Sequence, residues 1–301
     1  MGEDRPGASV EGSLPPLKPA PERPDLKAPP ERSDLKPPSE RRGLKAPPEL
    51  PGPQAPPEQR DLKPPPERLY GRARGHKLRP RQQRLLEVTL PRLRFPPSCA
   101  GDPFAAFPRP PHALWLEVGF GGGEHALAQI ATHPNIGLVA CEPFENGICS
   151  LLSRIVPEGG EADGLLPPNL LLWPDDARVL LRQLPDACLD RLFLLFPDPW
   201  PKARHAKRRF VHPASLPMVA RVLRPGAEWR VATDDPTYQA WVAEIVAAQD
   251  LFDVPPPATE RPPGWPPTRY EAKALREGRS PRYWTLSTRL PPRGKGEDAQ
   301  R

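Results

Sequence analysis

The sequence predicts an α/β fold in which a mostly parallel β-sheet is covered by helices on both faces. Short apolar runs of strand length alternate with amphipathic helical segments from Ala113 onward, and this alternation is typical of parallel sheets. Several of the apolar runs end at glycine or at an acidic residue. Open α/β sheets bind ligands at the carboxyl ends of their strands, so those positions are candidate site residues.

The elements follow from the periodicity. The predicted strands are 114–118, 136–141, 169–173, 192–196, 228–232 and 283–290. The predicted helices are 124–132, 147–155, 177–184, 213–223 and 237–248. The run 192–196 is wholly apolar, as expected for a central strand buried on both faces. Arg224, Pro225 and Gly226 predict the end of the helix that precedes them.

Residues 1–69 have a different composition from the rest of the chain. They contain no aromatic residue, hold 19 of the 51 prolines and repeat a Pro-Glu-Arg…Leu-Lys pattern every nine residues. Such a segment cannot bury enough apolar surface to fold, so we predict a disordered tail, and likewise a disordered C-terminus at 293–301. A solvated polyproline-II spacer is the simpler interpretation of the repeats, and a docking array for another protein or for RNA is the alternative.

The positive charge lies outside this tail. The tail carries 12 basic and 12 acidic residues, so the net charge of +6 belongs to residues 70–301 and favours nucleic acid as a partner. The segment that precedes the folded domain (95–292) is rich in basic residues: Arg72, Arg74, Lys77, Arg79, Arg81 and Arg84. We predict that 70–94 forms an arm that contacts an RNA backbone, followed by a short helix; a merely solvated arm is the alternative.

Other classes of protein are disfavoured. The four cysteines show neither CxxC spacing nor nearby histidines, so we expect buried thiols and no metal site. No run reaches the roughly 18 apolar residues that a membrane span needs. We therefore expect a cytoplasmic protein with no membrane partner.

The first predicted strand leads into a glycine loop, Glu117-Val-Gly-Phe-Gly-Gly-Gly123. The dinucleotide pattern GxGxxG would need a glycine at position 124, which is glutamate. The spacing acid-x-G-x-G-x-G fits without a gap and is typical of S-adenosylmethionine sites. A purely structural turn would look similar.

Acidic residues end the next two strands. Glu142 can accept both hydroxyls of a ribose, although dehydrogenases use the same device and a helix cap is also consistent with it. Of Asp175 and Asp176, one could accept from an adenine amino group, and the other is expected to cap a helix.

The central strand ends in Pro197-Asp198-Pro199-Trp200-Pro201, followed by the cationic segment 202–209. Proline fixes φ and lacks a backbone donor, so the carboxylate and the aromatic ring are held in a stiff turn. This combination suggests chemistry on a nucleobase. Trp200 either stacks on a base or packs in the core, and the cations either hold phosphates or form a solvated loop. We interpret His205 and His212 as RNA-contacting or structural.

Together these motifs resemble the bacterial tRNA (guanine-N7)-methyltransferases. The resemblance covers residues 70–290 and is carried by segment 196–210, loop 117–123, Ala-Thr-Asp-Asp at 232–235 and Thr-Arg-Tyr-Glu at 268–271. It implies a Rossmann-like class I methyltransferase with a seven-stranded sheet and a reversed last strand. It also implies S-adenosylmethionine as methyl donor, N7 of a guanine in the tRNA variable loop as acceptor, and either a monomer or a homodimer.

The resemblance assigns roles residue by residue. The implied cofactor contacts are Glu117, Gly119, Gly121, Gly123, Glu142, Asp176 and Asp198. Asp198 is also the implied catalytic residue. The implied substrate-binding residues are Lys202, Asp234, Thr268, Arg269, Tyr270 and Glu271. Glu271 would read the guanine edge, with an ion pair to Arg276 as the alternative.

Two other functions are consistent with parts of the sequence. A nicotinamide-dependent dehydrogenase would use the same type of fold, but Glu124 argues against it. A non-catalytic RNA-binding or scaffold protein would use the repeats as its active part.

Overall fold

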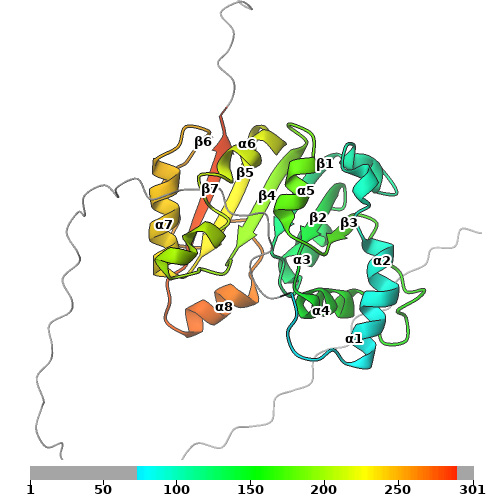
Figure 1. Ribbon diagram of the computed structural model, residues 1–301. Coiled ribbons are helices and arrows are strands. Elements are labelled where there is room, and N and C mark those ends of the chain that lie inside the picture. Colours follow the sequence, from blue (N-terminus) through cyan, green and yellow to red (C-terminus); the bar gives the residue numbers. More distant parts are fainter. Residues whose placement is uncertain (1–72, 290–301) are drawn as a thin grey trace, which may run out of the picture. The chain divides into compact units, whose positions relative to one another are not determined.

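The computed structural model describes residues 73–289 (Figure 1). The predicted tail (1–69), the start of the predicted arm including Arg72, and the predicted C-terminal segment (293–301) lie outside the described residues.

The fold is built on one seven-stranded sheet with the strand order β3-β2-β1-β4-β5-β7-β6. The strands are β1 (Ala113–Val118), β2 (Ile136–Cys141), β3 (Leu170–Trp173), β4 (Leu189–Leu195), β5 (Leu223–Thr233), β6 (Phe252–Asp253) and β7 (Arg282–Thr288). Neighbouring strands from β3 to β5 pair in parallel, whereas β7 is antiparallel to both β5 and β6. The predicted seven-stranded, mostly parallel sheet with a reversed last strand is therefore confirmed.

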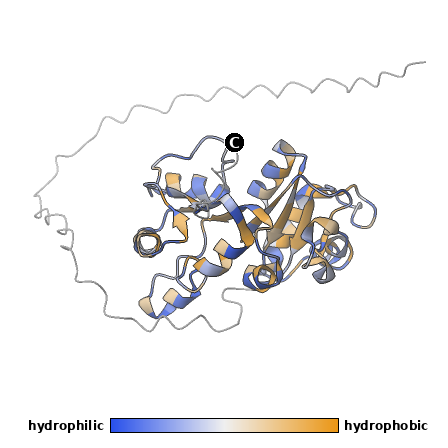
Figure 2. Cartoon of the chain, turned by 90° about the horizontal axis from the view of Figure 1, so that it is seen from above, coloured by the Kyte–Doolittle hydropathy of each residue, from blue (hydrophilic) through white to orange (hydrophobic). Residues whose placement is uncertain are grey.

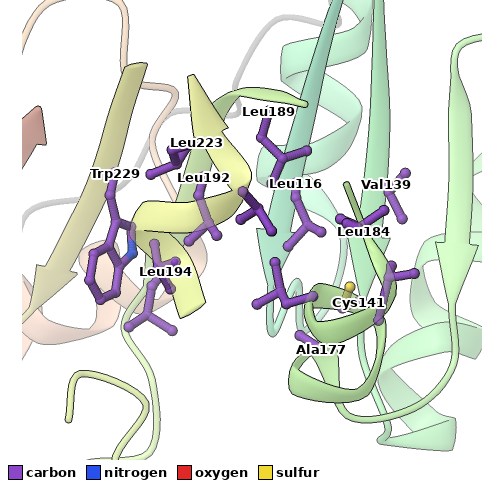
Figure 3. Packing of buried hydrophobic residues seen from close by; sticks show 14 of the residues in the cluster. Leu116, Val139, Cys141, Ala177, Leu184, Leu189, Leu192, Leu194, Leu223 and Trp229 are labelled. Carbon is purple, nitrogen blue, oxygen red and sulfur yellow. The ribbon is translucent and has the colours of Figure 1, made fainter. Parts of the chain in front are cut away.

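Helices cover both faces of this sheet. They are α3 (Glu124–Thr132), α4 (Glu145–Ile155), α5 (Ala177–Gln183), α6 (Leu216–Val222), α7 (Pro236–Ala247) and α8 (Arg269–Arg276). Successive residues of β4 alternate between two hydrophobic clusters. Leu192 and Leu194 pack with residues of α5, α6 and α7, as Figure 3 shows for the part nearest α5. Phe193 packs with residues of α3 and α4. Viewed from above, the strands lie as a mainly apolar layer among helices with one apolar side (Figure 2).

The segment predicted as an arm has two parts. Residues 73–79 have no regular structure and are mostly exposed. From there the chain is helical through α1 (Pro80–Arg84), a π-helical turn (Leu85–Thr89) and α2 (Leu90–Leu93), and it packs in the same cluster as α3 and α4. This second part therefore belongs to the body of the domain.

A buried carboxylate fastens these first helices. The Glu161 side chain is 3% exposed and lies 3.2 Å from Arg81 Nε and 3.9 Å from Arg84 Nε. The hydroxyl of Thr89 donates to the Glu161 carbonyl oxygen at 2.8 Å. Arg81 and Arg84, which the sequence groups with the RNA-contacting cations, are thus partly committed to holding the helix in place.

The elements that were not predicted from the sequence are β6, α8 and three short 3₁₀ helices at Pro97–Cys99, Pro103–Ala106 and Ala203–Arg208. β6 has two residues, which is too short to give a periodicity. α8 follows a proline-rich loop, has eight mostly polar residues and buries only Glu271 and Ala274.

Within residues 73–289, no helix is long and apolar enough to cross a membrane. In the same range, no cluster of His, Cys, Asp and Glu residues has the arrangement of a metal site. All four cysteines are free thiols.

The start of α3 depends on Gly123, which leads to a prediction on stability. Gly123 has φ +81°, and a Cβ there would lie 2.5 Å from the side chain of Leu151, which is fully buried. Gly159 has φ +90° but open space around it. Both Gly→Ala changes incur the left-handed backbone penalty, and only Gly123→Ala also overpacks the core, so it should lower the free energy of unfolding by about 1–3 kcal/mol more.

Urea unfolding of the two variants measures this difference. Equal losses in the two variants would show that the contact with Leu151 does not constrain the start of α3.

Candidate active site

The carboxyl ends of β1, β2, β3 and β4 surround a pocket of about 940 Å³. This is where an open parallel sheet is expected to bind its ligand. The predicted site residues that line it are Gly119, Gly121, Glu142, Asp176, Asp198 and Tyr270. The predicted residues outside its lining are Glu117, Gly123, Lys202, Asp234, Thr268, Arg269 and Glu271.

The loop 117–123 needs glycine for two reasons: its backbone adopts positive φ angles, and a side chain at Gly121 or Gly123 would crowd its neighbours. Gly119, Gly121 and Gly123 all have positive φ, at +75°, +56° and +81°. At Gly121 a Cβ would lie 3.0 Å from the ring of Tyr270, which projects from α8. The loop therefore brings bare backbone to the pocket and lets an aromatic ring pack directly against it.

Glu142 joins the glycine loop to the turn after β2. Its Oε2 accepts from the backbone N–H of Gly121 at 2.8 Å, and its Oε1 accepts from that of Phe144 at 3.0 Å. Burial raises the pKa of the Glu142 carboxyl, and the two N–H donors partly oppose this effect. Each carboxylate oxygen has a second lone pair, so Glu142 can still accept from a ligand hydroxyl. The role of Glu142 in ribose binding stays a prediction.

The two aspartates after β3 divide their roles. Asp176 caps α5: its Oδ1 accepts from Arg178 N at 2.9 Å, and the Arg178 guanidinium lies 2.6 Å from Oδ2. Asp175 is exposed and also lines the pocket. The structure therefore assigns the cap to Asp176, the residue expected to contact the cofactor, and leaves the Asp175 side chain more accessible to a ligand.

Glu117 lies behind the pocket in a buried polar chain. Its Oε2 is 3.0 Å from His125 Nδ1, and His125 Nε2 is 3.0 Å from Gln129 Nε2. All three side chains are at most 4% exposed. Since the Gln129 amide donates, His125 Nε2 accepts, and His125 Nδ1–H donates to Glu117. His125 and Gln129 were not predicted as site residues, although two polar residues four positions apart on the helix that follows the glycine loop are a recognisable pattern.

The turn after β4 holds its backbone in an unusual conformation. Phe196 has φ +52° and Trp200 has φ +46°, both in the left-handed region that non-glycine residues rarely adopt. The Phe196 N–H donates to the Ala232 carbonyl of β5 at 2.7 Å. Asp198, midway between the two strained residues, is exposed and lines the pocket.

Trp200 is packed by side chains of the cationic segment that follows. The Arg208 guanidinium lies over the Trp200 ring at 4.7 Å, and the His205 ring meets it edge-on at 5.8 Å. Partial desolvation and the neighbouring Arg and Lys side chains lower the pKa of His205. Lys202, Arg204 and Lys207 remain exposed.

Thr268 and Glu271 form the N-terminal capping box of α8. The Thr268 hydroxyl accepts from Glu271 N at 3.0 Å, and Glu271 Oε2 accepts from Thr268 N at 3.4 Å. Glu271 Oε1 accepts from Arg261 Nε at 3.1 Å and from the Tyr283 hydroxyl at 2.7 Å. The expected alternative partner of Glu271, Arg276, is replaced by Arg261. Both oxygens of this buried carboxylate are thus engaged by protein donors.

Arg269 and Tyr270, which lie between Thr268 and Glu271, are both exposed. Tyr270 is 40% exposed, and Arg269 Nη2 donates to its hydroxyl at 2.9 Å. Asp234, at the start of the β5–α7 connection, lies 2.8 Å from Arg279 Nη1. Asp234 is therefore held in an ion pair that was not predicted from the sequence.

The chain is similar to known methyltransferases over most of the residues that form the sheet and the pocket. The family described as "Putative methyltransferase" matches residues 111–282. The tRNA (guanine-N(7)-)-methyltransferase of Granulibacter bethesdensis is 64% identical over 220 residues, which cover 72% of this chain and 93% of that protein. The chain belongs to the tRNA (guanine-N7-)-methyltransferase family.

Other members of this family align over the same part of the chain. The protein of the same name from Rhodospirillum rubrum is 49% identical over 72% of this chain and 86% of its own length. That from Paramagnetospirillum magneticum is 45% identical over 74% of this chain and 93% of its own length. Membership of this enzyme family does not favour the dehydrogenase and scaffold alternatives.

The division of roles between Asp175 and Asp176 gives a test by paired substitution. Asp176→Ala removes a helix cap and a charge-assisted hydrogen bond, so it should lower the free energy of unfolding by roughly 2–4 kcal/mol. Asp175→Ala removes an exposed carboxylate and the hydrogen bond that it accepts from Asp176 N at 2.7 Å, so it should lower the free energy of unfolding by at most about 1 kcal/mol. Thermal or urea unfolding of both variants measures the difference, and similar losses would contradict the assignment of the cap to Asp176.

Proposed function

We propose that this protein transfers the methyl group of S-adenosylmethionine to N7 of a guanine in the variable loop of tRNA. The observation that carries the proposal is the position of Asp198: an exposed carboxylate on a stiff turn that lines the same pocket as the glycine loop and Glu142. The names of the curated relatives support the choice of acceptor.

The residues of the pocket fit this methyl donor. The loop at Gly119 and Gly121 presents backbone without side chains, Glu142 retains acceptor capacity for a ribose, and Asp175 is accessible for an adenine amino group. The carboxylates that line the pocket also suit a cation. When bound, S-adenosylmethionine supplies an electrophilic methyl group on a positively charged sulfonium.

Guanine N7 needs little from the protein besides placement. Its lone pair lies in the plane of the ring and is unprotonated near neutral pH, so no general base is required. Catalysis then depends on holding the acceptor in line with the methyl group. Positive charge moves onto the purine during transfer, and a fixed carboxylate stabilises it. We assign that role to Asp198, which could also accept from the N1–H and N2–H of guanine.

Exposed cations near the pocket fit the backbone of an RNA. Lys202, Arg204 and Lys207 directly follow the turn that carries Asp198. The arm approaches from another part of the chain: the Ala73 carbonyl accepts from Glu145 N at 3.0 Å, and Gly75 packs on the ring of Phe144, which lines the pocket. Phosphate contacts from both segments would hold a guanine over the pocket.

The proposal is tested with unmodified tRNA and methyl-labelled S-adenosylmethionine. The wild-type protein should label one guanine in the variable loop, which borohydride and aniline cleavage then locates. Asp198→Asn keeps the shape of the side chain but removes its charge, so kcat should fall about 10²–10³-fold. The unfolding midpoint should change little, because the Asp198 side chain is exposed.

A wild-type protein that binds S-adenosylmethionine yet labels no tRNA would overturn the proposed function. Full activity of Asp198→Asn would overturn only the role of Asp198.

The arm gives a second test, on salt dependence. Changing Arg74, Lys77 and Arg79 to Gln should weaken tRNA binding and reduce the slope of log K against log salt by up to about 0.7–0.9 for each phosphate that is no longer neutralised. The control makes the same change in charge at three exposed arginines outside the proposed RNA-binding segments, Arg109, Arg182 and Arg289. Equal effects of the two triple variants would mean that the arm contributes only general charge.

A further inference from the structure

Arg209 differs from the other cations of the segment 202–209. The sequence groups it with residues that hold phosphates, yet its side chain is buried, with 5% exposure, whereas Lys207 is exposed and Arg208 is partly exposed. A guanidinium that binds RNA phosphates must be accessible to the RNA. The burial of Arg209 therefore calls for another role.

The hydrogen bonds of Arg209 go to the turn that carries Asp198. Its Nε donates to the Pro199 carbonyl at 3.1 Å, and its Nη2 donates to the Trp200 carbonyl at 3.0 Å. These are the two residues directly after Asp198. One planar group thus fixes two consecutive carbonyls, which is a geometry that arginine provides and lysine does not.

Arg209 also contacts α7, the helix that packs against the sheet. The Arg209 guanidinium lies 4.8 Å from the ring centre of Trp241. Trp241 is buried, and its indole N–H donates to the Val211 carbonyl at 2.6 Å. The turn is therefore connected through Arg209 to a helix packed in the core.

The turn needs such an external donor. Pro197, Pro199 and Pro201 have no backbone N–H, so they cannot hold the turn through hydrogen bonds of their own. Phe196 and Trp200 are held at positive φ, which is unfavourable by about 1–3 kcal/mol for each residue and persists only where the surroundings impose it. Two charge-assisted hydrogen bonds to the carbonyls supply part of that constraint.

Burial of the guanidinium is itself unfavourable. It lowers the pKa of Arg209, and the nearby Tyr238, Asp235 and Glu244 oppose that effect. The desolvation is offset by the two carbonyls and the aromatic ring face. An arginine kept in this position has its donors directed at the turn and not at solvent.

We infer that Arg209 is a positioning residue that holds the Pro197–Asp198–Pro199–Trp200 turn in its strained form, and so fixes Asp198 relative to the pocket. The catalytic part of this inference rests on the proposed function. The mechanical part, a rigid turn, does not depend on it.

The experiment compares Arg209→Lys and Arg209→Met with the wild type and with the control Arg289→Lys, an exposed arginine next to the sheet edge. Arg209→Lys keeps the charge and at least one donor, whereas Arg209→Met keeps only the bulk. The first readout uses the free protein: the rate at which trypsin cleaves after the exposed Lys202. This rate should rise in the order wild type, Arg209→Lys, Arg209→Met, because the released turn exposes that bond. Arg289→Lys should behave as the wild type.

The second readout is steady-state methylation of unmodified tRNA. Since a misplacement of about 1 Å can cost 10²-fold in rate, kcat should fall about tenfold in Arg209→Lys and about a hundredfold in Arg209→Met. The KM for tRNA and the Kd for S-adenosylmethionine should stay within about twofold of wild type, because Arg209 contacts neither ligand. Unfolding midpoints identify any variant that fails to fold. If Arg209→Met does not fold, the comparison of Arg209→Lys with the wild type decides the test.

Unchanged proteolysis and unchanged kcat in both variants would overturn the inference. A raised KM for tRNA with a normal kcat and a flatter salt dependence would also overturn it, because that result identifies a phosphate ligand. If the wild type methylates no tRNA, the proposed function fails, while the proteolysis of the free protein still decides whether Arg209 holds the turn.

Discussion

The structure of the site depends on the way in which β4 ends. The central strand leads directly into a turn that places a carboxylate at the pocket, and the prolines that make this turn stiff also remove most of its own hydrogen-bond donors. The rest of the molecule has to hold that turn from outside. The Phe196 N–H is bonded to β5, and the Arg209 guanidinium bonds the carbonyls on the other side of Asp198.

On the side of the pocket that we propose binds the methyl donor, a charged side chain likewise holds the backbone in place. Glu142 bonds two backbone N–H groups that belong to different loops, so the glycine loop and the β2–α4 turn move as one unit. Tyr270 packs on Gly121 and makes α8 part of the same wall. The pocket is therefore assembled from five segments of the chain whose relative positions are set by a few buried or half-buried polar contacts.

The sequence predicted the sheet and most helices because those elements rest on local periodicity. The helix after the glycine loop was predicted with the bounds that the structure has, Glu124–Thr132, since its apolar spacing and the preceding glycines agree. α8 was missed because few of its residues are buried, although Thr268 and Glu271 have the spacing of a capping box, and that pattern could have revealed the helix start. The two-residue strand β6 is defined by its pairing with β7 and not by its own sequence.

The residue types of the candidate site were predictable, but their partners were not. Asp175 and Asp176 are adjacent carboxylates, and only the structure distinguishes the cap from the accessible side chain. Arg208 and Arg209 are identical in type, yet one lies over Trp200 at the pocket and the other is buried against Trp241. Glu271 is bonded to Arg261 and Tyr283, residues ten and twelve positions away. Such choices depend on tertiary packing, which no local pattern contains.

The position of β7 in the sheet has a consequence for the order of folding during synthesis. β7 is the last strand to be synthesised, yet it lies between β5 and β6 in the sheet. The hydroxyl of its Tyr283 donates to the carboxylate of Glu271, in the first turn of α8. While a ribosome is still making the chain, β6 has no neighbour to pair with and α8 lacks one of its anchors. The nascent protein can therefore form the glycine loop and the β4 turn early, but the wall that Tyr270 contributes is completed only after β7 has emerged from the exit tunnel.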